Sequence, residues 1–383
     1  MLCELYNRLR AKKINLFKTQ SISMTRTDLR AAALAERRSN QELLTIHSQV
    51  VQNVGDRVYI AFKRFLSCQS RFPRKKHPRK YVSFVYLQYG FKLRRECALY
   101  LFGIGQVRMF MHRQLVGSVQ SLTIKREVHQ WFAIFVTERP TPPKPDFNSI
   151  TPCRIRGADL GLTRFAVFDD NESIEYPRYF ESSERKLETL QKKLRNKKQG
   201  SKRENNLLRS LAKIHLHVKR KRDDWQNKCV KEIFEKSDII VLEKLDVRRM
   251  LKRHSLAKSI SDSAWARFVL KVKYKALANG KYLVQVDPWG TTQFCYNCLS
   301  WVPKDLSNRT HSCQNCHISI PRDLNSARLI KRLGIQRGPP SDGGSSPAEL
   351  RPLLPPEGAA SRGAEAGSHL PRWRTSQNND VGS

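Results

Sequence analysis

Acidic residues are scarce in this sequence. Only 34 Asp and Glu stand against 71 Lys and Arg in 383 residues, which leaves a formal net charge of +37. This imbalance argues against an ordinary metabolic enzyme, because such a surplus repels itself in a compact fold unless a polyanion neutralises it. Nucleic acid is therefore the first expected partner, and an anionic membrane surface is the second.

Long apolar runs are also missing. No window of about 18 apolar residues occurs, which excludes a membrane-spanning helix. The segment from Met1 to Leu16 is interrupted by charges such as Glu4 and Arg8, so it lacks the apolar block of a secretory signal. We therefore expect a cytoplasmic, nucleoid-associated protein in a reducing compartment, with no membrane partner.

The nine cysteines are too irregular for a disulfide framework, since five of them are scattered without a repeated spacing. The other four form two pairs, Cys295-x2-Cys298 and Cys313-x2-Cys316, separated by 14 residues. Two such pairs can present four thiolates to one Zn²⁺ ion and leave no open position for catalysis. The spacing predicts a structural zinc ribbon at about 292–318 rather than four unrelated core cysteines. His311 and His317 lie close by and are assigned to outer or surface positions.

Composition divides the rest of the chain. The 39% hydrophobic content is enough for two or three folded domains. Helical spacing over 28–65 predicts one or two helices, and strand-like runs between 81 and 137 predict a small antiparallel sheet or barrel. We interpret 1–138 as a nucleic-acid recognition region and 139–152, with five prolines, as a linker. In 334–383, 22 of 50 residues are Gly, Pro or Ser, which predicts a disordered tail.

Residues 153–333 follow a definite order of expected elements. Strands are expected at 154–159, 164–169, 173–176, 238–242 and 282–286, and helices at 181–236 with a break at Gly200, at 262–278 and at 323–333. This order is that of a ribonuclease H-like mixed sheet, so the predicted fold is α/β here, preceded by a helical and β region.

Three acids stand at the ends of these expected elements. Asp159 and Glu243 each end an apolar strand, and Asp323 opens the last helix. Taken singly, each has an ordinary explanation as a turn residue, a surface cap or a helix N-cap. In a ribonuclease H-like sheet, however, these ends converge and can hold two Mg²⁺ ions. One ion would activate water and the other would stabilise the leaving oxygen of a phosphodiester.

Four strings of the sequence together resemble the TnpB (OrfB) family. They are Arg156-Gly-Ala-Asp-Leu-Gly-Leu162, Ile240-Val-Leu-Glu-Lys-Leu245, Val286-Asp-Pro288 with Thr292-Gln-Phe-Cys-Tyr-Asn-Cys298, and Arg322-Asp-Leu-Asn-Ser-Ala327. The resemblance is most specific over about 154–333 and looser upstream, around Phe72-Pro73, 88–93 and Trp131-Phe132-Ala133, which look like the family's wedge and recognition region.

The family consists of insertion-sequence-encoded, RNA-guided DNA endonucleases related to type V CRISPR effectors. The resemblance implies a RuvC domain with Asp159, Glu243 and Asp323 as catalytic carboxylates, an inserted zinc ribbon, a DNA target and a guide RNA. Two departures stand out. The family's usual opening strand, with a Tyr-x-Pro-like segment, does not precede Tyr6, which indicates truncation or an internal start. Leu299 and His317 replace the glycine that commonly follows each knuckle, which should weaken the ribbon modestly.

Two basic segments are candidate nucleic-acid contacts. Residues 184–222 hold 15 Lys or Arg against three acids, with leucines at helical spacing, and 71–80 forms a second patch flanked by Phe72 and Tyr81. The predicted contacts are Arg71, Arg74, Lys75, Lys76, Arg79, Lys80, Lys192, Lys193, Arg195, Lys197, Lys198, Lys202, Arg203, Lys219, Arg220, Lys221 and Arg222.

The leading prediction is a transposon-encoded, RNA-guided, Mg²⁺-dependent DNA endonuclease. Two other functions stay open: a non-cleaving nucleic-acid-binding protein that regulates transposition, and a strand-transfer transposase, which also uses a ribonuclease H-like acidic triad. Joined rather than cut products would identify the last of these.

Overall fold

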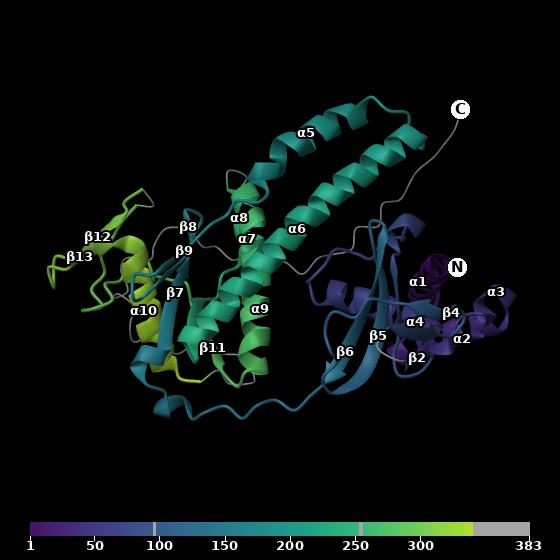
Figure 1. Cartoon of the computed structure of the whole chain (residues 1–383), viewed down its shortest axis with the longest axis horizontal. Coiled ribbons are helices and arrows are strands. Elements are labelled where there is room, and N and C mark those ends of the chain that lie inside the picture. The colour runs from purple at the N-terminus through teal and green to yellow at the C-terminus, as the bar shows by residue number, and fades with distance from the viewer. Residues whose placement is uncertain (95–96, 253–255, 306, 340–383) are drawn as a thin grey trace. The chain divides into compact units, whose positions relative to one another are not determined.

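The computed structural model describes residues 1–94, 97–252, 256–305 and 307–339 (Figure 1). It divides into two compact units, and each unit is built from several segments that alternate along the chain. Among the described residues, unit 1 comprises Met1–Asp146, Tyr176–Asp238 and Val247–Tyr282, and unit 2 comprises Phe147–Glu175, Ile239–Asp246 and the residues from Leu283 to 339. Most of the predicted disordered tail, 340–383, lies outside the described residues.

The first boundary between the units, after Asp146, falls inside the predicted proline-rich linker. Beyond it, the sequence predicts one continuous nuclease domain over 153–333. In the structure, the helices between the strands of that segment belong to unit 1 instead, because they pack mainly on one another.

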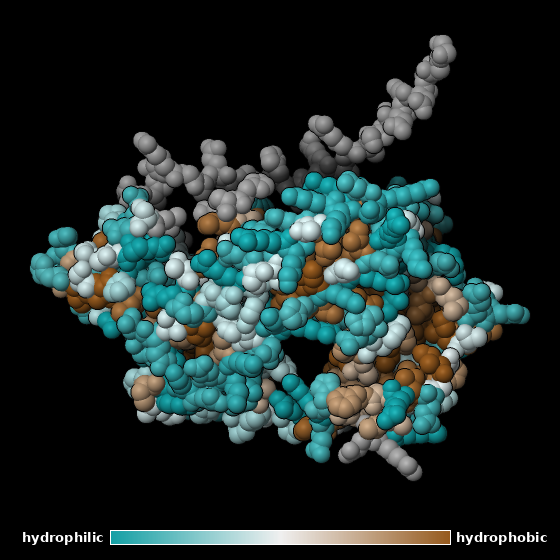
Figure 2. All heavy atoms as spheres, turned by 45° about the horizontal axis from the view of Figure 1, so that its top comes forward, coloured by the Kyte–Doolittle hydropathy of each residue, from teal (hydrophilic) through white to brown (hydrophobic). Residues whose placement is uncertain are grey.

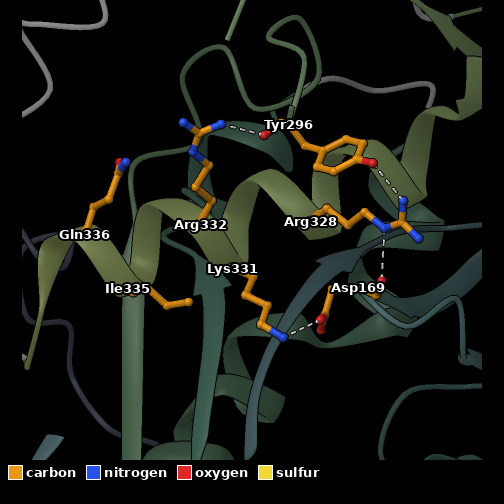
Figure 3. A pocket seen from close by; sticks show the side chains of 7 residues that line it. All are labelled: Asp169, Tyr296, Arg328, Lys331, Arg332, Ile335 and Gln336. Atoms are coloured by element: carbon orange, nitrogen blue, oxygen red, sulfur yellow. Dashed lines mark hydrogen bonds and ion pairs between the residues drawn. The ribbon is translucent and has the colours of Figure 1, made fainter. Parts of the chain in front are cut away.

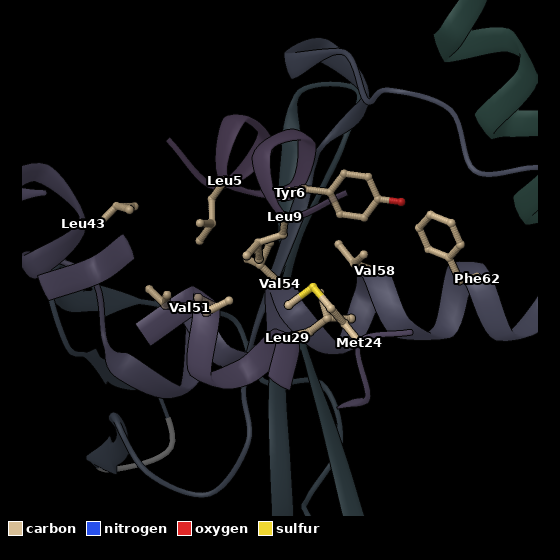
Figure 4. Close-up of a cluster of buried hydrophobic side chains, with 12 residues drawn as sticks. Leu5, Tyr6, Leu9, Met24, Leu29, Leu43, Val51, Val54, Val58 and Phe62 are labelled. Atoms are coloured by element: carbon tan, nitrogen blue, oxygen red, sulfur yellow. The ribbon is translucent and has the colours of Figure 1, made fainter. Parts of the chain in front are cut away.

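Unit 1 begins with a bundle of helices: α1 (Leu2–Gln20), α2 (Arg26–Arg38), α3 (Gln41–Leu44) and α4 (Ser48–Leu66). Helix α1 was not predicted, although Leu2, Leu5 and Leu9 follow the spacing that places side chains on one helix face. Leu5, Leu9 and Val58 are fully buried in the core that joins α1, α2 and α4 (Figure 4). A capping box between Thr25 and Asp28 starts α2.

Two separate three-stranded antiparallel sheets follow. The first has the order β1-β5-β6 and the second the order β2-β3-β4. Their strands are β1 (Ser83–Tyr86), β2 (Phe91–Arg94), β3 (Ala98–Leu101), β4 (Gly105–Arg108), β5 (Ser118–Glu127) and β6 (Gln130–Glu138). The predicted antiparallel sheet is therefore present as two sheets, and the described strands do not close into one barrel.

The rest of unit 1 is helical. It contains α5 (Glu181–Arg195), α6 (Lys202–Lys236), α7 (Val247–Met250), α8 (Ala257–Ser263) and α9 (Trp265–Ala278). The predicted break at Gly200 is confirmed, since α5 ends before it and α6 starts after it. Ser201 begins α6 by accepting a hydrogen bond from the backbone N–H of Glu204.

Unit 2 is built on a five-stranded mixed sheet with the order β11-β10-β7-β8-β9. Its strands are β7 (Ile155–Leu160), β8 (Arg164–Phe168), β9 (Ser173–Glu175), β10 (Ile239–Glu243) and β11 (Tyr282–Val286). Strands β10 and β7 are parallel, with Leu242 opposite Ala158, while β8 runs antiparallel to both β7 and β9. Every residue of β10 is buried, as its apolar sequence predicts.

Helix α10 (Arg322–Arg337) packs mainly on β7. Two glycines permit this close approach: a β-carbon on Gly157 would lie 2.3 Å from the Ala327 carbonyl oxygen, and one on Gly334 would lie 2.4 Å from Val241 Cγ1. The sequence predicts that the helix ends at 333 and that the tail starts at Gly334. That boundary is wrong, because Gly334 is buried against Val241 and the helix continues to Arg337.

The segment 287–321, between β11 and α10, is called the cysteine module here. It holds the four paired cysteines and a small antiparallel pair of strands, β12 (Thr310–Ser312) and β13 (Ser319–Pro321). Within the described part of the chain, no helix combines the length and apolarity needed to cross a membrane.

Candidate functional site

The pairing of β7 with β10 places two of the predicted acids side by side. Because the strands are parallel and Leu242 lies opposite Ala158, the next residues, Glu243 and Asp159, meet at the same end of the sheet. Glu243 is 7% exposed, so its carboxyl group is largely removed from water. Asp159 is half-buried and stands one residue before the end of β7. A largely buried acid at a strand end is uncommon, and here a second acid lies beside it.

The third acid lies close enough to act on the first. Burial raises the pKa of the Asp159 carboxyl well above its usual range, and the nearby charges of Glu243 and then Asp323 raise it further. Arg322 opposes this shift. Three carboxyl groups therefore share one electrostatic environment, in which a bound cation would favour their ionised forms.

Asp323 is held from both sides by arginines. Its carboxylate lies 3.6 Å from a terminal nitrogen of Arg164 and 3.5 Å from one of Arg322. Among the described residues, the three carboxylates do not gather as tightly as a closed metal cage; the cysteines form the group that does. Hard oxygen donors of this kind suit Mg²⁺, which keeps several waters and needs few protein ligands.

Thr291 is a site residue that the sequence analysis missed. Its hydroxyl, on a residue only 2% exposed, donates a hydrogen bond to Glu243 Oε1 at 2.5 Å. Burial raises the pKa of Glu243, the Thr291 bond opposes that rise, and the charge of Asp287 adds to it. A threonine between Trp289-Gly290 and a cysteine knuckle gives no sequence signal of this contact, which depends on the fold.

Asn325 is the second missed residue. It is fully buried on α10, two residues after Asp323. Its side-chain oxygen accepts from the backbone N–H of Tyr296 at 3.0 Å, and its amide nitrogen donates to the Phe294 carbonyl at 2.8 Å. Asn325 therefore fixes the first cysteine knuckle to the helix that carries Asp323. The available sequence signal was an amide side chain in the first turn of the helix expected at 323–333.

The four predicted cysteines converge. The ligand atoms of Cys295, Cys298, Cys313 and Cys316 all lie within 4.8 Å of one another. Two sulfur pairs are separated by 3.6 Å and 3.5 Å, close to the roughly 3.8 Å expected between sulfurs of a tetrahedral site with Zn–S bonds of about 2.3 Å. Burial raises the pKa of the Cys295 thiol to about 12. A thiolate at this position is therefore unfavourable unless a cation binds beside it. The donor set fits Zn²⁺.

The residues that replace the knuckle glycines adopt the glycine conformation. Leu299 has a φ of 59° and His317 a φ of 57°, both in the left-handed region. His317 is exposed, whereas His311 is fully buried and contacts the Lys304 ammonium group through Nδ1. Burial lowers the pKa of His311 to about 4, so this imidazole is neutral at pH 7.

A pocket of about 360 Å³ lies where α10 meets the cysteine module (Figure 3). Arg328 donates to the Asp169 carbonyl and the Tyr296 hydroxyl, and Lys331 pairs with the Asp169 carboxylate at 2.7 Å. Arg332 donates to the Tyr296 carbonyl at 2.9 Å. Arg328, Lys331 and Arg332 thus connect helix α10 with the sheet and with the cysteine module. None of the three predicted acids lines the pocket.

The predicted basic contacts in unit 1 fall into two groups. Arg222 pairs with the buried carboxylate of Asp262 at 2.6 Å, and Lys219 and Arg220 pair with Glu127 at 3.2 and 3.6 Å. These three therefore have structural partners that the sequence did not reveal. The others are exposed, and hydrophilic side chains cover most of the visible face in Figure 2. The exposed set is Arg71, Arg74, Lys75, Lys76, Arg79, Lys80, Lys192, Lys193, Arg195, Lys197, Lys198, Lys202, Arg203 and Lys221.

Two family models match the part of the chain that builds this site. Residues 149–254 match the OrfB family of the IS605 type, described as "Probable transposase", and residues 265–330 match the Cas12f1-like TNB domain. Over these residues the chain is similar to the TnpB (OrfB) proteins. The resemblance predicted from the four sequence strings is thus confirmed.

Individual proteins that are similar to this chain carry matching names. A candidate RNA-guided DNA endonuclease of Streptomyces pristinaespiralis is 26% identical over 276 residues, covering 70% of this chain and 67% of that protein. The candidate RNA-guided DNA endonuclease InsQ of Escherichia coli K12 is 27% identical over 256 residues, covering 62% of each chain. The TnpB-like protein L79 of Acanthamoeba polyphaga mimivirus is 28% identical over 195 residues, and the match covers 37% of its length.

A solved structure shares the fold. Cas12f1, determined in a complex with single guide RNA and target DNA, superposes with a TM-score of 0.53 at 13% identity, covering 86% of this chain and 80% of that one. The likeness confirms the mixed α/β architecture of the chain.

Proposed function

We propose that this chain is a Mg²⁺-dependent, RNA-guided DNA endonuclease of transposon origin, with a RuvC-like site formed by Asp159, Glu243 and Asp323. The observation that carries the proposal is the β7–β10 pairing, which sets two inward acids side by side at adjacent strand ends within the electrostatic reach of a third. The names of the relatives and the nucleic acids in the Cas12f1 complex supply the substrate class.

In this proposal each residue has a definite task. Asp159 and Glu243 hold the cation side by side, and Thr291 fixes the orientation of the Glu243 carboxylate. Two Mg²⁺ ions bound there would supply an activated water and stabilise the leaving oxygen of the phosphodiester. Arg164 and Arg322, which lie against Asp323, hold its carboxylate at the entrance of helix α10.

The other parts of the chain serve binding in this proposal. The four cysteines hold a structural Zn²⁺, and the exposed cations of 71–80, α5 and the first part of α6 contact the phosphates of DNA and guide RNA. In such systems base pairing with the guide reads the target sequence, while the protein reads a short flanking motif. The protein would act in the cytoplasm on nucleoid DNA.

The test is cleavage of a plasmid library with a randomised flank by protein co-expressed with RNA from its own locus. The parent protein should cut in Mg²⁺ and not in EDTA, and Asp159→Ala should bind DNA without cutting it. Glu175→Gln is the matched control, because Glu175 is an exposed acid on β9 of the same sheet. Full cleavage by Asp159→Ala would overturn the site. Binding without cleavage by the parent would favour a regulatory protein, and joined products a strand-transfer enzyme.

A further inference from the structure

Three aromatic rings of the cysteine module form one cluster, in which the two indoles are stacked. The indoles of Trp289 and Trp301 lie 5.8 Å apart between centroids at an interplanar angle of 25°, and the Phe294 ring meets Trp301 edge-on at 4.9 Å. Gly290, with a φ of 73°, turns the chain so tightly that a β-carbon there would lie 2.7 Å from the Phe294 ring. The rings are therefore held in one arrangement.

The two indoles are open to solvent. Trp289 is 48% exposed and Trp301 is 41% exposed, although large aromatic side chains normally bury most of their surface. The two indoles are stacked on each other and keep a large accessible surface, on which another flat group can extend the stack.

This stack is attached directly to the carboxylate site. Trp289 and Phe294 flank Thr291, whose hydroxyl bonds Glu243, and Asn325 bonds the Phe294 carbonyl from the helix that carries Asp323. The backbone N–H of Trp289 donates to the Asp287 carboxylate at 2.8 Å. A group stacked on the indoles is thus positioned by contacts that also orient the acids.

We propose that Trp289 and Trp301 form a stacking platform for an unpaired base of the single-stranded DNA that enters the carboxylate site. A base inside a duplex has both faces covered by its neighbours, so only an unpaired strand offers a free face to an indole. Lys244, which follows Glu243 and bonds the Val286 carbonyl through its backbone N–H, is an exposed cation at the end of β10 that carries the site. Stacking of this kind tolerates any base, which suits an enzyme whose sequence reading is done elsewhere.

The inference rests on the proposed function for the role of the bound strand, but its test does not require cleavage. Binding is measured with the complete protein–RNA complex carrying Asp159→Asn, using a fluorescent single-stranded oligonucleotide and the same sequence as a duplex. Base stacking contributes about 1–3 kcal/mol per base, so Trp289→Leu should weaken single-strand binding roughly 5- to 150-fold. Duplex binding should not change, and Trp289→Tyr, which keeps a ring, should bind like the parent.

A second arm isolates the stacked base. Oligonucleotides with abasic sites should bind the parent complex more weakly than intact ones, and Trp289→Leu should abolish that difference. Tyr274→Ala, which removes an exposed aromatic ring from α9, should preserve it. Zinc content equal to the parent shows that the variant module is folded.

The inference is overturned if Trp289→Leu binds intact single strands as tightly as the parent, or if the parent does not discriminate against abasic sites. A change in self-association without a change in DNA binding would assign the indoles to a protein contact and also overturn it. If the parent protein cleaves no DNA but still shows the binding differences described above, the proposed nuclease function is rejected and the stacking platform is supported.

Discussion

The Thr291 hydroxyl donates its proton to Glu243 Oε1 across 2.5 Å, which links the cysteine module to the end of strand β10. The contact lies on a residue that is 2% exposed, so water does not replace it readily. It makes the orientation of one proposed metal ligand depend on a residue outside the mixed sheet.

Replacing this hydroxyl tests the link. Thr291→Val keeps the shape and removes the donor, so the Mg²⁺ concentration for half-maximal cleavage should rise about 10- to 100-fold, as for other residues that orient metal ligands. Thr291→Ser keeps the donor and should stay near the parent. The measurement is a Mg²⁺ titration of the cleavage rate, and equal Mg²⁺ requirements for Val and Ser variants would refute the orienting role.

Asn325 should contribute to stability. Asn325→Ala leaves the Phe294 carbonyl and the Tyr296 N–H without their partner, which costs about 1–3 kcal/mol each when such groups remain buried. The Tm of the zinc-loaded protein should fall by several degrees. Asn315→Ala is the control, because it removes an exposed hydrogen bond to Ser300 in the same module and should change the Tm little. Similar Tm values for the two variants would contradict this account.

The left-handed residues of the knuckles should make the module less stable than it can be. Because φ near 58° costs a residue with a β-carbon about 1–2 kcal/mol, Leu299→Gly and His317→Gly should each slow zinc loss to a chelator. Leu299→Ala, which keeps the β-carbon, should not. A gain for alanine equal to that for glycine would show that side-chain exposure, and not backbone strain, sets the release rate.

The raised pKa of Asp159 predicts how pH acts on the metal-free protein. The native state holds a proton that the unfolded state has released, so stability should fall as pH rises above the usual carboxyl range of about 4. Asp159→Asn removes this cost and should raise the metal-free Tm at pH 7. Mg²⁺ should then stabilise the parent and not the variant. Thermal unfolding at several pH values checks this, and a parent Tm that rises from pH 5 to 8 in EDTA would count against it.

Much of the fold and the site could be predicted from local sequence. Strand β11 was predicted with the bounds that the structure gives, Tyr282–Val286, because a short apolar run between polar segments has few alternatives. The cysteine spacing correctly predicted that four thiols meet, since each pair occupies one tight turn. The placement of Asp159 beside Glu243 followed from the order of the elements.

Other features depend on contacts that no local pattern records. The bonds from Thr291 and Asn325 join residues that are 48 and 31 positions from their partners. Arg222 looked like a phosphate contact in a basic run, but its partner Asp262 comes from a different helix. Gly334 stands inside helix α10 because Val241 leaves no room for a β-carbon, so packing and not helix propensity accounts for a glycine at this position.

The central claim is that the acids at the ends of β7 and β10 perform metal-dependent cleavage. Single-turnover cleavage of a guide-matched DNA duplex by the complete protein–RNA complex tests it most directly, comparing the parent with Glu243→Gln and measuring DNA binding in parallel. The account predicts that the variant binds the duplex like the parent while its Mg²⁺-dependent cleavage falls to background. Cleavage by Glu243→Gln at the parent rate would contradict it.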